Sequence, residues 1–202
     1  DIIPAKGHTF IGNTCEICDY AFYSEGLAHA DNGNTVTITG PGDCKDTLIY
    51  IPPFIDEKPV TEIGDYAFYN CTSLTEIVIP DSVTSIGSKA FFQCASLTEI
   101  VIPKSVTTIG SSAFSYCTSL EEIVILEGVE SVGEGAFQYC TSLKKIVIPE
   151  GVKEIGNFAF HKCDELTTVY YRGSKEQWDS ITIGLYNDAL TEDKIKYNYP
   201  GE

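Results

Sequence analysis

Val83-Thr-Ser-Ile-Gly-Ser-Lys-Ala-Phe-Phe-Gln-Cys-Ala-Ser-Leu-Thr-Glu-Ile-Val-Ile102 is one copy of a pattern that recurs along most of this chain. The interval is 23 residues, and the register holds over five copies without an insertion. Three columns of the repeat show it: Gly64, Gly87, Gly110, Gly133 and Gly156; Phe68, Phe91, Phe114, Phe137 and Phe160; Cys71, Cys94, Cys117, Cys140 and Cys163. A unit this small cannot bury its own apolar face, so the copies must stack into a solenoid with a shared core.

Each copy contains one segment with the alternation of a strand. Ile77 and Ile79 are expected to point inward and Val78 outward, because side chains alternate across a strand. Pro80 ends this strand, and the glycine of the next segment permits a bend into a short helical turn. The residue after that glycine is a helix N-cap type in four copies, at Asp65, Ser88, Ser111 and Asn157. The predicted fold class is therefore an α/β repeat solenoid with a short parallel strand ladder and short helical turns.

The two ends of the chain depart from the repeat and are expected to cap it. Strands at 35–39 and 48–51 are predicted to form an N-terminal β cap over the first full coil, with residues 54–58 projecting from that coil. After the last copy, Ser174 and Gln177 form a capping-box pattern that opens a helix, and Trp178 is placed to cover the final coil. A strand near Ile195 completes this C-terminal helix and strand cap. The predicted divisions are an N-terminal arm at 1–34, the β cap and half-coil at 35–62, the solenoid at 63–172 and the C-terminal cap at 173–202.

Composition and charge restrict the classes of partner. The 202 residues are 43% apolar, enough for a continuous core, and carry a formal net charge of -16. Such a charge disfavours nucleic acid and anionic membrane surfaces, and no apolar run is long enough to insert directly into a membrane. The chain begins at Asp1 and has no Met, which suggests a mature product or an excised piece whose signal segment lies outside it.

The five repeat cysteines are expected to face inward, beside the repeat phenylalanines. Equivalent residues of stacked coils lie about 5 Å apart, close enough for disulfides in principle. An odd number of equivalent thiols cannot all pair without breaking the symmetry of the repeat. The favoured interpretation is a ladder of reduced, buried thiols that behave as small apolar side chains.

The N-terminal arm holds a possible half-site for a metal. His8, Cys15 and Cys18 combine a Cys-x-x-Cys knuckle with a nearby imidazole, a ligand set that zinc accepts. A structural site needs a fourth ligand, for which Cys44 and His29 are the candidates. Two alternatives remain open: a disulfide that involves Cys15, Cys18 or Cys44, and no special role for these residues. No other cofactor is expected.

The pattern Leu-x-x-Ile-x-Ile-Pro-x-x-Val-x-x-Ile-Gly-x-x-Ala-Phe-x-x-Cys resembles the BspA-type leucine-rich repeat of surface and secreted proteins from host-associated bacteria and some protists. The resemblance covers roughly residues 35–198, and both ends look like that family's caps. It implies a right-handed leucine-rich repeat solenoid, adhesion or ligand capture, and a secreted or cell-surface location. It supplies no catalytic residues. One departure is Leu126, which stands where Pro80, Pro103 and Pro149 stand in other copies.

The outward rows of the strand ladder are the candidate binding surface for a protein or glycan. One row is Val78, Val101, Val124, Val147 and Tyr170, and beside it run Glu76, Glu99, Glu122 and Lys145. Two simpler explanations stay open: valine is a favoured strand residue, and the carboxylates can form a solvated acidic face. The alternative function is a spacer within a larger surface protein, without a ligand of its own.

Catalysis is not expected, because His8, His29 and His161 lie in no nucleophile motif and no phosphate-binding loop follows a strand. The module is expected to be monomeric.

Overall fold

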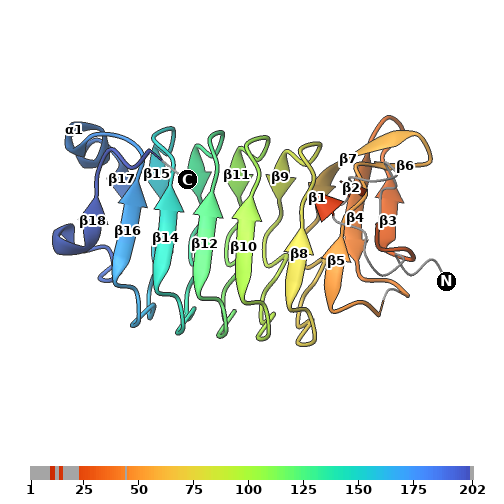
Figure 1. Cartoon of the computed structure of the whole chain (residues 1–202), viewed down its shortest axis with the longest axis horizontal. Coiled ribbons are helices and arrows are strands. Elements are labelled where there is room, and N and C mark those ends of the chain that lie inside the picture. The colour runs from red at the N-terminus through yellow and green to blue at the C-terminus, as the bar shows by residue number, and fades with distance from the viewer. Residues whose placement is uncertain (1–9, 12–13, 16–22, 44, 201–202) are drawn as a thin grey trace.

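The computed structural model describes residues 10–11, 14–15, 23–43 and 45–200 as an elongated β-solenoid of about seven turns (Figure 1). Each turn contributes one strand to a front ladder. The strands of this ladder are β5 (Leu48–Tyr50), β8 (Glu76–Val78), β10 (Glu99–Ile102), β12 (Glu122–Ile125), β14 (Lys145–Ile148), β16 (Thr168–Tyr171) and β18 (Ile195–Lys196). All neighbours that pair do so in parallel. The predicted stacked repeat with a parallel strand ladder is confirmed.

A second ladder lies behind the first, and the sequence pattern did not predict it (Figure 1). Its parallel strands are β4 (Val36–Gly40), β7 (Lys58–Ile63), β9 (Ser85–Ile86), β11 (Thr108–Ile109), β13 (Ser131–Val132), β15 (Glu154–Ile155) and β17 (Thr182–Ile183). Most of these strands have two residues, too few to show a period-two pattern. The solenoid within the repeat region is therefore built from β-strands and turns, and its class is not α/β.

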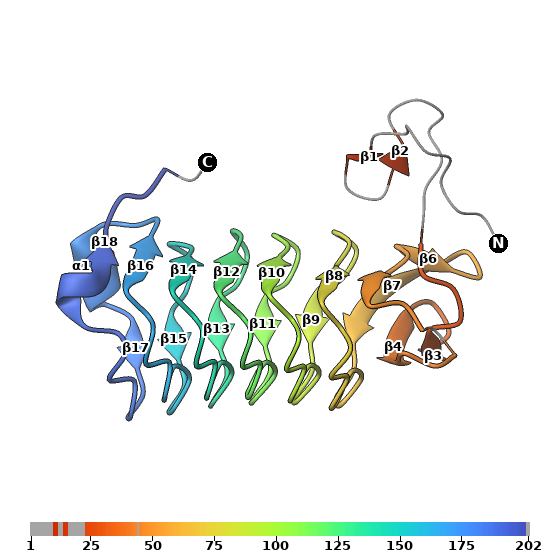
Figure 2. The same ribbon diagram turned by 60° about the horizontal axis from the view of Figure 1, so that its bottom comes forward.

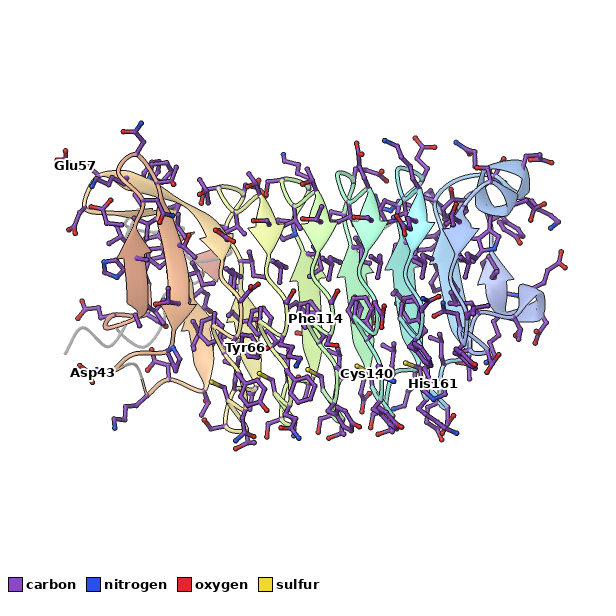
Figure 3. All side chains as sticks on the ribbon, turned by 180° about the vertical axis from the view of Figure 1, so that it is seen from behind. Asp43, Glu57, Tyr66, Phe114, Cys140 and His161 are labelled. Atoms are coloured by element: carbon purple, nitrogen blue, oxygen red, sulfur yellow. The ribbon has the colours of Figure 1, made fainter. Side chains whose placement is uncertain are left out.

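The core between the ladders is a stack of identical side chains. The five repeat phenylalanines are 0% exposed, and successive rings stack with centroids 5.0–5.4 Å apart. Phe114 and Cys140 lie within this interior in Figure 3. The thiols of Cys94, Cys117, Cys140 and Cys163 are free and buried, and each donates a hydrogen bond to the carbonyl of a phenylalanine in the preceding coil, with 3.1–3.2 Å between sulfur and oxygen. Cys71 is free and half-buried. The predicted ladder of reduced, buried thiols is confirmed for these four.

The turns that follow the back ladder are not the helices that the sequence predicted. They contain left-handed residues at two positions per coil, such as Tyr66 (φ 59°) and Asn70 (φ 57°), and a helix cannot pass through such residues. The repeat glycines let these coils approach closely: a Cβ at Gly110 would lie 2.5 Å from the carbonyl carbon of Gly87. Asp65 does not cap a helix. Its carboxylate accepts a hydrogen bond from the Ser88 backbone amide of the next coil at 2.6 Å.

The N-terminal cap contains the two predicted strands. The strands at 36–40 and 48–50 form as expected, β4 in the back ladder beside β7 and β5 in the front ladder beside β8, where the half-coil was predicted. The back ladder is closed by β3 (Ala28–Asp31), which pairs antiparallel with β4. Residues 54–58 project as a hairpin between β6 (Phe54–Ile55) and β7, as predicted (Figure 2). A further hairpin joins β1 (Phe10–Ile11) and β2 (Thr14–Cys15).

The C-terminal cap follows the prediction. Ser174 is the N-cap of helix α1 (Lys175–Asp179), and the Ser174–Gln177 capping box is formed in both directions. Trp178 is 6% exposed and packs edge-on against Tyr171, with ring centroids 5.1 Å apart. A short 3-10 helix, η1 (Glu192–Lys194), precedes β18. Asn187 ties this cap to the last coil, because its side-chain oxygen accepts from the Phe160 amide and its NH₂ donates to the carbonyls of Gly156 and Gly184.

Candidate functional site: the front ladder

The front ladder places the predicted outward row in register but interrupts it once. Val101 is paired with Val124, Val124 with Val147, and Val147 with Tyr170 on adjacent strands. Val78 lies on β8, where it is paired with Tyr50 of β5. Strand β8 does not pair with β10. The five-stranded part of the ladder therefore starts at β10, and the row has a break between Val78 and Val101.

A hollow of about 280 Å³ lies at this break. Its apolar lining includes Val78, Val101, Pro103 and Leu126, and the carboxylate-bearing Glu76 and Glu99 stand at it as well. Val101 is 50% exposed, so its methyl groups are available to a partner. Leu126 is the residue that replaces the repeat proline. Its amide donates to the Ile102 carbonyl at 2.9 Å, a bond that proline cannot make.

The other end of the row is covered by the chain itself. Val147 is only 4% exposed and is not available at the surface, contrary to the expectation that the whole row faces solvent. After β18 the chain turns back in front of the ladder (Figure 2), and Tyr199 packs on Tyr170 with ring centroids 4.2 Å apart. The Tyr199 amide holds this tail by donating to the Tyr171 carbonyl at 3.0 Å. The accessible part of the row is therefore its N-terminal half.

The charged row beside the valines changes sign along the ladder. Glu99 lies next to Glu122, and Glu122 lies next to Lys145, whose ammonium is 2.9 Å from the Glu122 carboxylate. Lys145 also lies over the Tyr170 ring, 5.6 Å from its centroid. At the other end, burial raises the pKa of the Tyr50 hydroxyl, and the Glu76 carboxylate adds to this. The carboxylates nearest the hollow, on Glu76 and Glu99, are the part of this row that a partner would meet.

Most of the predicted metal ligands lie outside the described residues. His8, Cys18 and the possible fourth ligand Cys44 are outside the described residues, and the side chain of Cys15 is as well. His29 is exposed, and its Nδ1 is 3.1 Å from the Leu27 carbonyl oxygen. Within the described ranges, no group of three or more His, Cys, Asp or Glu side chains could hold a metal ion.

A second surface was missed by the sequence reasoning, and we call it the aromatic row. It consists of Tyr66, Tyr69, Phe92, Tyr116, Tyr139, Phe158, His161 and Tyr186, whose rings contact one another along the turns that follow the back ladder. Figure 3 labels Tyr66 and His161 in this row. In the five repeat copies the signal was present within two residues of each Ala-Phe pair, but the aromatic residue occupies a different position of the repeat in different copies.

The fold and the repeat define a leucine-rich repeat solenoid. A family model described as BspA type leucine rich repeat region matches residues 61–182 in six copies, more than half of the chain. The chain therefore belongs to the BspA-type leucine-rich repeat family. A search of curated proteins found no match. Within the described residues, no helix is long and apolar enough to cross a bilayer.

Solved structures of bacterial leucine-rich repeat proteins share the fold. A leucine rich cell surface protein from Faecalibacterium prausnitzii A2-165 is 32% identical with a TM-score of 0.72, and the match covers 78% of this chain but only 41% of that protein. The leucine-rich repeat protein of T. pallidum is 28% identical with a TM-score of 0.63, covering 79% of this chain and 83% of that one. The pneumococcal vaccine antigen PcpA, 22% identical with a TM-score of 0.54 over 74% of this chain and 49% of its own, shows the fold alone.

Proposed function

We propose that this chain is a non-catalytic binding module of a secreted or cell-surface protein, and that it mediates adhesion by docking a protein partner at the hollow between β8 and β10. The observation that carries the proposal is the break in the front ladder, where Val78 and Val101 line an apolar hollow at the surface. The F. prausnitzii relative is described as a cell surface protein, which supports the location.

The lining favours a protein side chain over a glycan as the occupant. Val78, Val101, Pro103 and Leu126 offer apolar contact, which stabilises a buried aliphatic or aromatic anchor. Glu76 and Glu99 add negative charge beside the apolar surface, so a basic residue next to the anchor would be accommodated.

The test is retention on an array of immobilised extracellular matrix proteins and glycans. The chain is expected to bind at least one protein, and Val101→Lys is expected to weaken that binding at least about tenfold, because a charge would enter the apolar hollow. Thr108→Lys is the matched control, since Thr108 is exposed in the same coil but belongs to the back ladder.

Three results would overturn the proposal. Equal retention of the Val101→Lys and Thr108→Lys variants would remove the hollow from the binding surface. Retention on glycans alone would remove the protein partner, and retention on no member of the array would favour the spacer function instead.

A further inference from the structure

The rings of the aromatic row are arranged as stacked pairs separated by breaks. Tyr69 stacks on Phe92, Tyr116 on Tyr139 and Phe158 on Tyr186, with ring centroids 5.3, 4.5 and 4.5 Å apart. Between the pairs the rings tilt: Tyr66 is inclined 47° to Tyr69, Phe92 58° to Tyr116, and Tyr139 83° to His161. At each break the next ring is tilted, so the outer face of the stacked pair is not covered by a parallel ring.

Burial in the core does not explain the most exposed rings of this row. Tyr66, Tyr116 and Tyr186 are 52%, 37% and 54% exposed, so they add little to the core. Tyr66, Tyr116, Tyr139, Phe158 and Tyr186 all have φ between 58° and 63°. Bulky residues are strained there, whereas Asn70 holds the same repeat position as Tyr116 at lower cost. Large exposed rings kept at strained positions indicate a surface that serves binding.

One break already holds a cation. The ammonium of Lys89 lies 5.4 Å from the centroid of the Tyr66 ring and 5.8 Å from that of Phe92. Lys89 occupies the same repeat position as Tyr66, Ser112, Gly135 and Phe158, so this lysine is specific to one coil. This contact shows that rings next to a break of this row can hold a lysine ammonium group.

The charge around the row favours the same ligand. Asp65 before Tyr66 and Asp188 two residues after Tyr186 are exposed carboxylate residues that adjoin the row along the chain, and Lys162 after His161 is the exposed cation next to it. The chain as a whole carries a formal charge of -16. Aromatic faces and a negative field together attract arginine and lysine side chains, and arginine adds stacking of its planar guanidinium.

We propose that the aromatic row is a second binding surface, separate from the front ladder, and that it takes an extended basic polypeptide of a partner protein. The partner's arginine or lysine side chains enter the breaks at Phe92–Tyr116 and Tyr139–His161, as Lys89 does at the first break. Lys89 thus competes with the partner for the N-terminal end of the row.

The test measures binding of an oligo-arginine peptide to the intact chain at physiological ionic strength. In the Tyr116→Gln/Tyr139→Gln variant both rings are lost, the net charge is unchanged, and Gln93 shows that glutamine is accepted at this left-handed position. Affinity is expected to fall about fivefold to twentyfold, from two exposed cation–π contacts. The control is Phe54→Gln, which removes a 58% exposed ring on the β6–β7 hairpin and is expected to bind as the unmodified chain does.

A second pair of variants keeps the proposal testable if the first pair disturbs folding. Lys89→Ser, which copies Ser112, removes the competing cation and is expected to raise the affinity about twofold to fivefold. Lys153→Thr, which copies Thr107, removes the same charge from the back-ladder side and should change affinity less. Equal affinities for these two variants, or unchanged binding by the Tyr116→Gln/Tyr139→Gln variant, would show that only diffuse charge attraction acts and would overturn the proposal.

Discussion

Truncation of a phenylalanine in the middle of the core stack should cost more than truncation of the equivalent phenylalanine at its end. Phe114 is 0% exposed and stacks between Phe91 and Phe137, with ring centroids 5.0 and 5.4 Å away. Phe68 is equally buried but stacks on Phe91 alone among the repeat phenylalanines of the described chain. Phe114→Ala should lower the free energy of unfolding by about 3–5 kcal/mol. Phe68→Ala should cost about 0.5–1.5 kcal/mol less, the worth of one ring pair.

The assay is equilibrium unfolding in urea, followed by two probes. Far-UV circular dichroism reports on the ladders, and the fluorescence of Trp178, the single tryptophan, reports on the C-terminal cap. Coincident transitions show that the coils unfold together and allow one free energy to be assigned, which stacked repeats do not always permit. A loss below about 1 kcal/mol for Phe114→Ala, or a larger loss for Phe68→Ala, would refute the shared stacked core.

Two further predictions concern the C-terminal cap and the buried thiols. Asn187→Ala leaves the Phe160 amide without its 2.9 Å acceptor, so it should destabilise the chain by about 1–3 kcal/mol in thermal or urea unfolding. The exposed control Asp188→Ala should change stability by less than about 0.5 kcal/mol. Similar values for both variants would contradict the role of Asn187 in joining the cap to the last coil. Burial raises the pKa of the Cys94 and Cys163 thiols to about 12 from 9.0, so the unfolded chain releases these protons first as pH rises. The stability that is present below pH 9 is therefore lost between pH 9 and 12, at about 1.4 kcal/mol per pH unit for each thiol. Free energies of unfolding measured in urea between pH 9 and 12 should fall less steeply with pH for a Cys94→Ala/Cys163→Ala variant than for the unmodified chain. An identical pH dependence of the two would contradict the raised pKa values.

The sequence predicted the stacked repeat because its evidence is redundant. Each inward residue meets its own equivalent in the next coil, so one register explains the columns of Phe, Cys and Leu at once. The Ser174–Gln177 capping box and the placement of Trp178 were equally readable, because both depend on neighbours in the chain. Local rules and a strict period carried these predictions.

The errors came where the outcome depends on contacts between coils. Asp65 after a glycine matched a helix N-cap, but the close approach of coils at the repeat glycines brings the Ser88 amide to its carboxylate. The strands at 36–40 and 48–50 were visible, yet the sequence did not show that two ladders exist and that each strand joins a different one.

Prediction of the candidate surfaces also failed where the outcome depends on contacts between coils. The register of the valine row was readable, but the break at β8, the hollow beside Val101 and the covering of the ladder's C-terminal end arise from the arrangement of whole segments. The aromatic row was hidden because its rings change repeat position between Phe92 and Tyr116 while remaining neighbours in space, with centroids 5.5 Å apart.

Thiol labelling with an alkylating reagent, mapped by peptide mass spectrometry, tests most directly whether the coils share one closed interior. In the native chain Cys94, Cys117, Cys140 and Cys163 should remain unlabelled, because each is at most 1% exposed and burial raises the pKa of its thiol. In urea all four should react together as the stack opens. Labelling of any of the four in native buffer at the rate seen in urea would contradict the stacked solenoid.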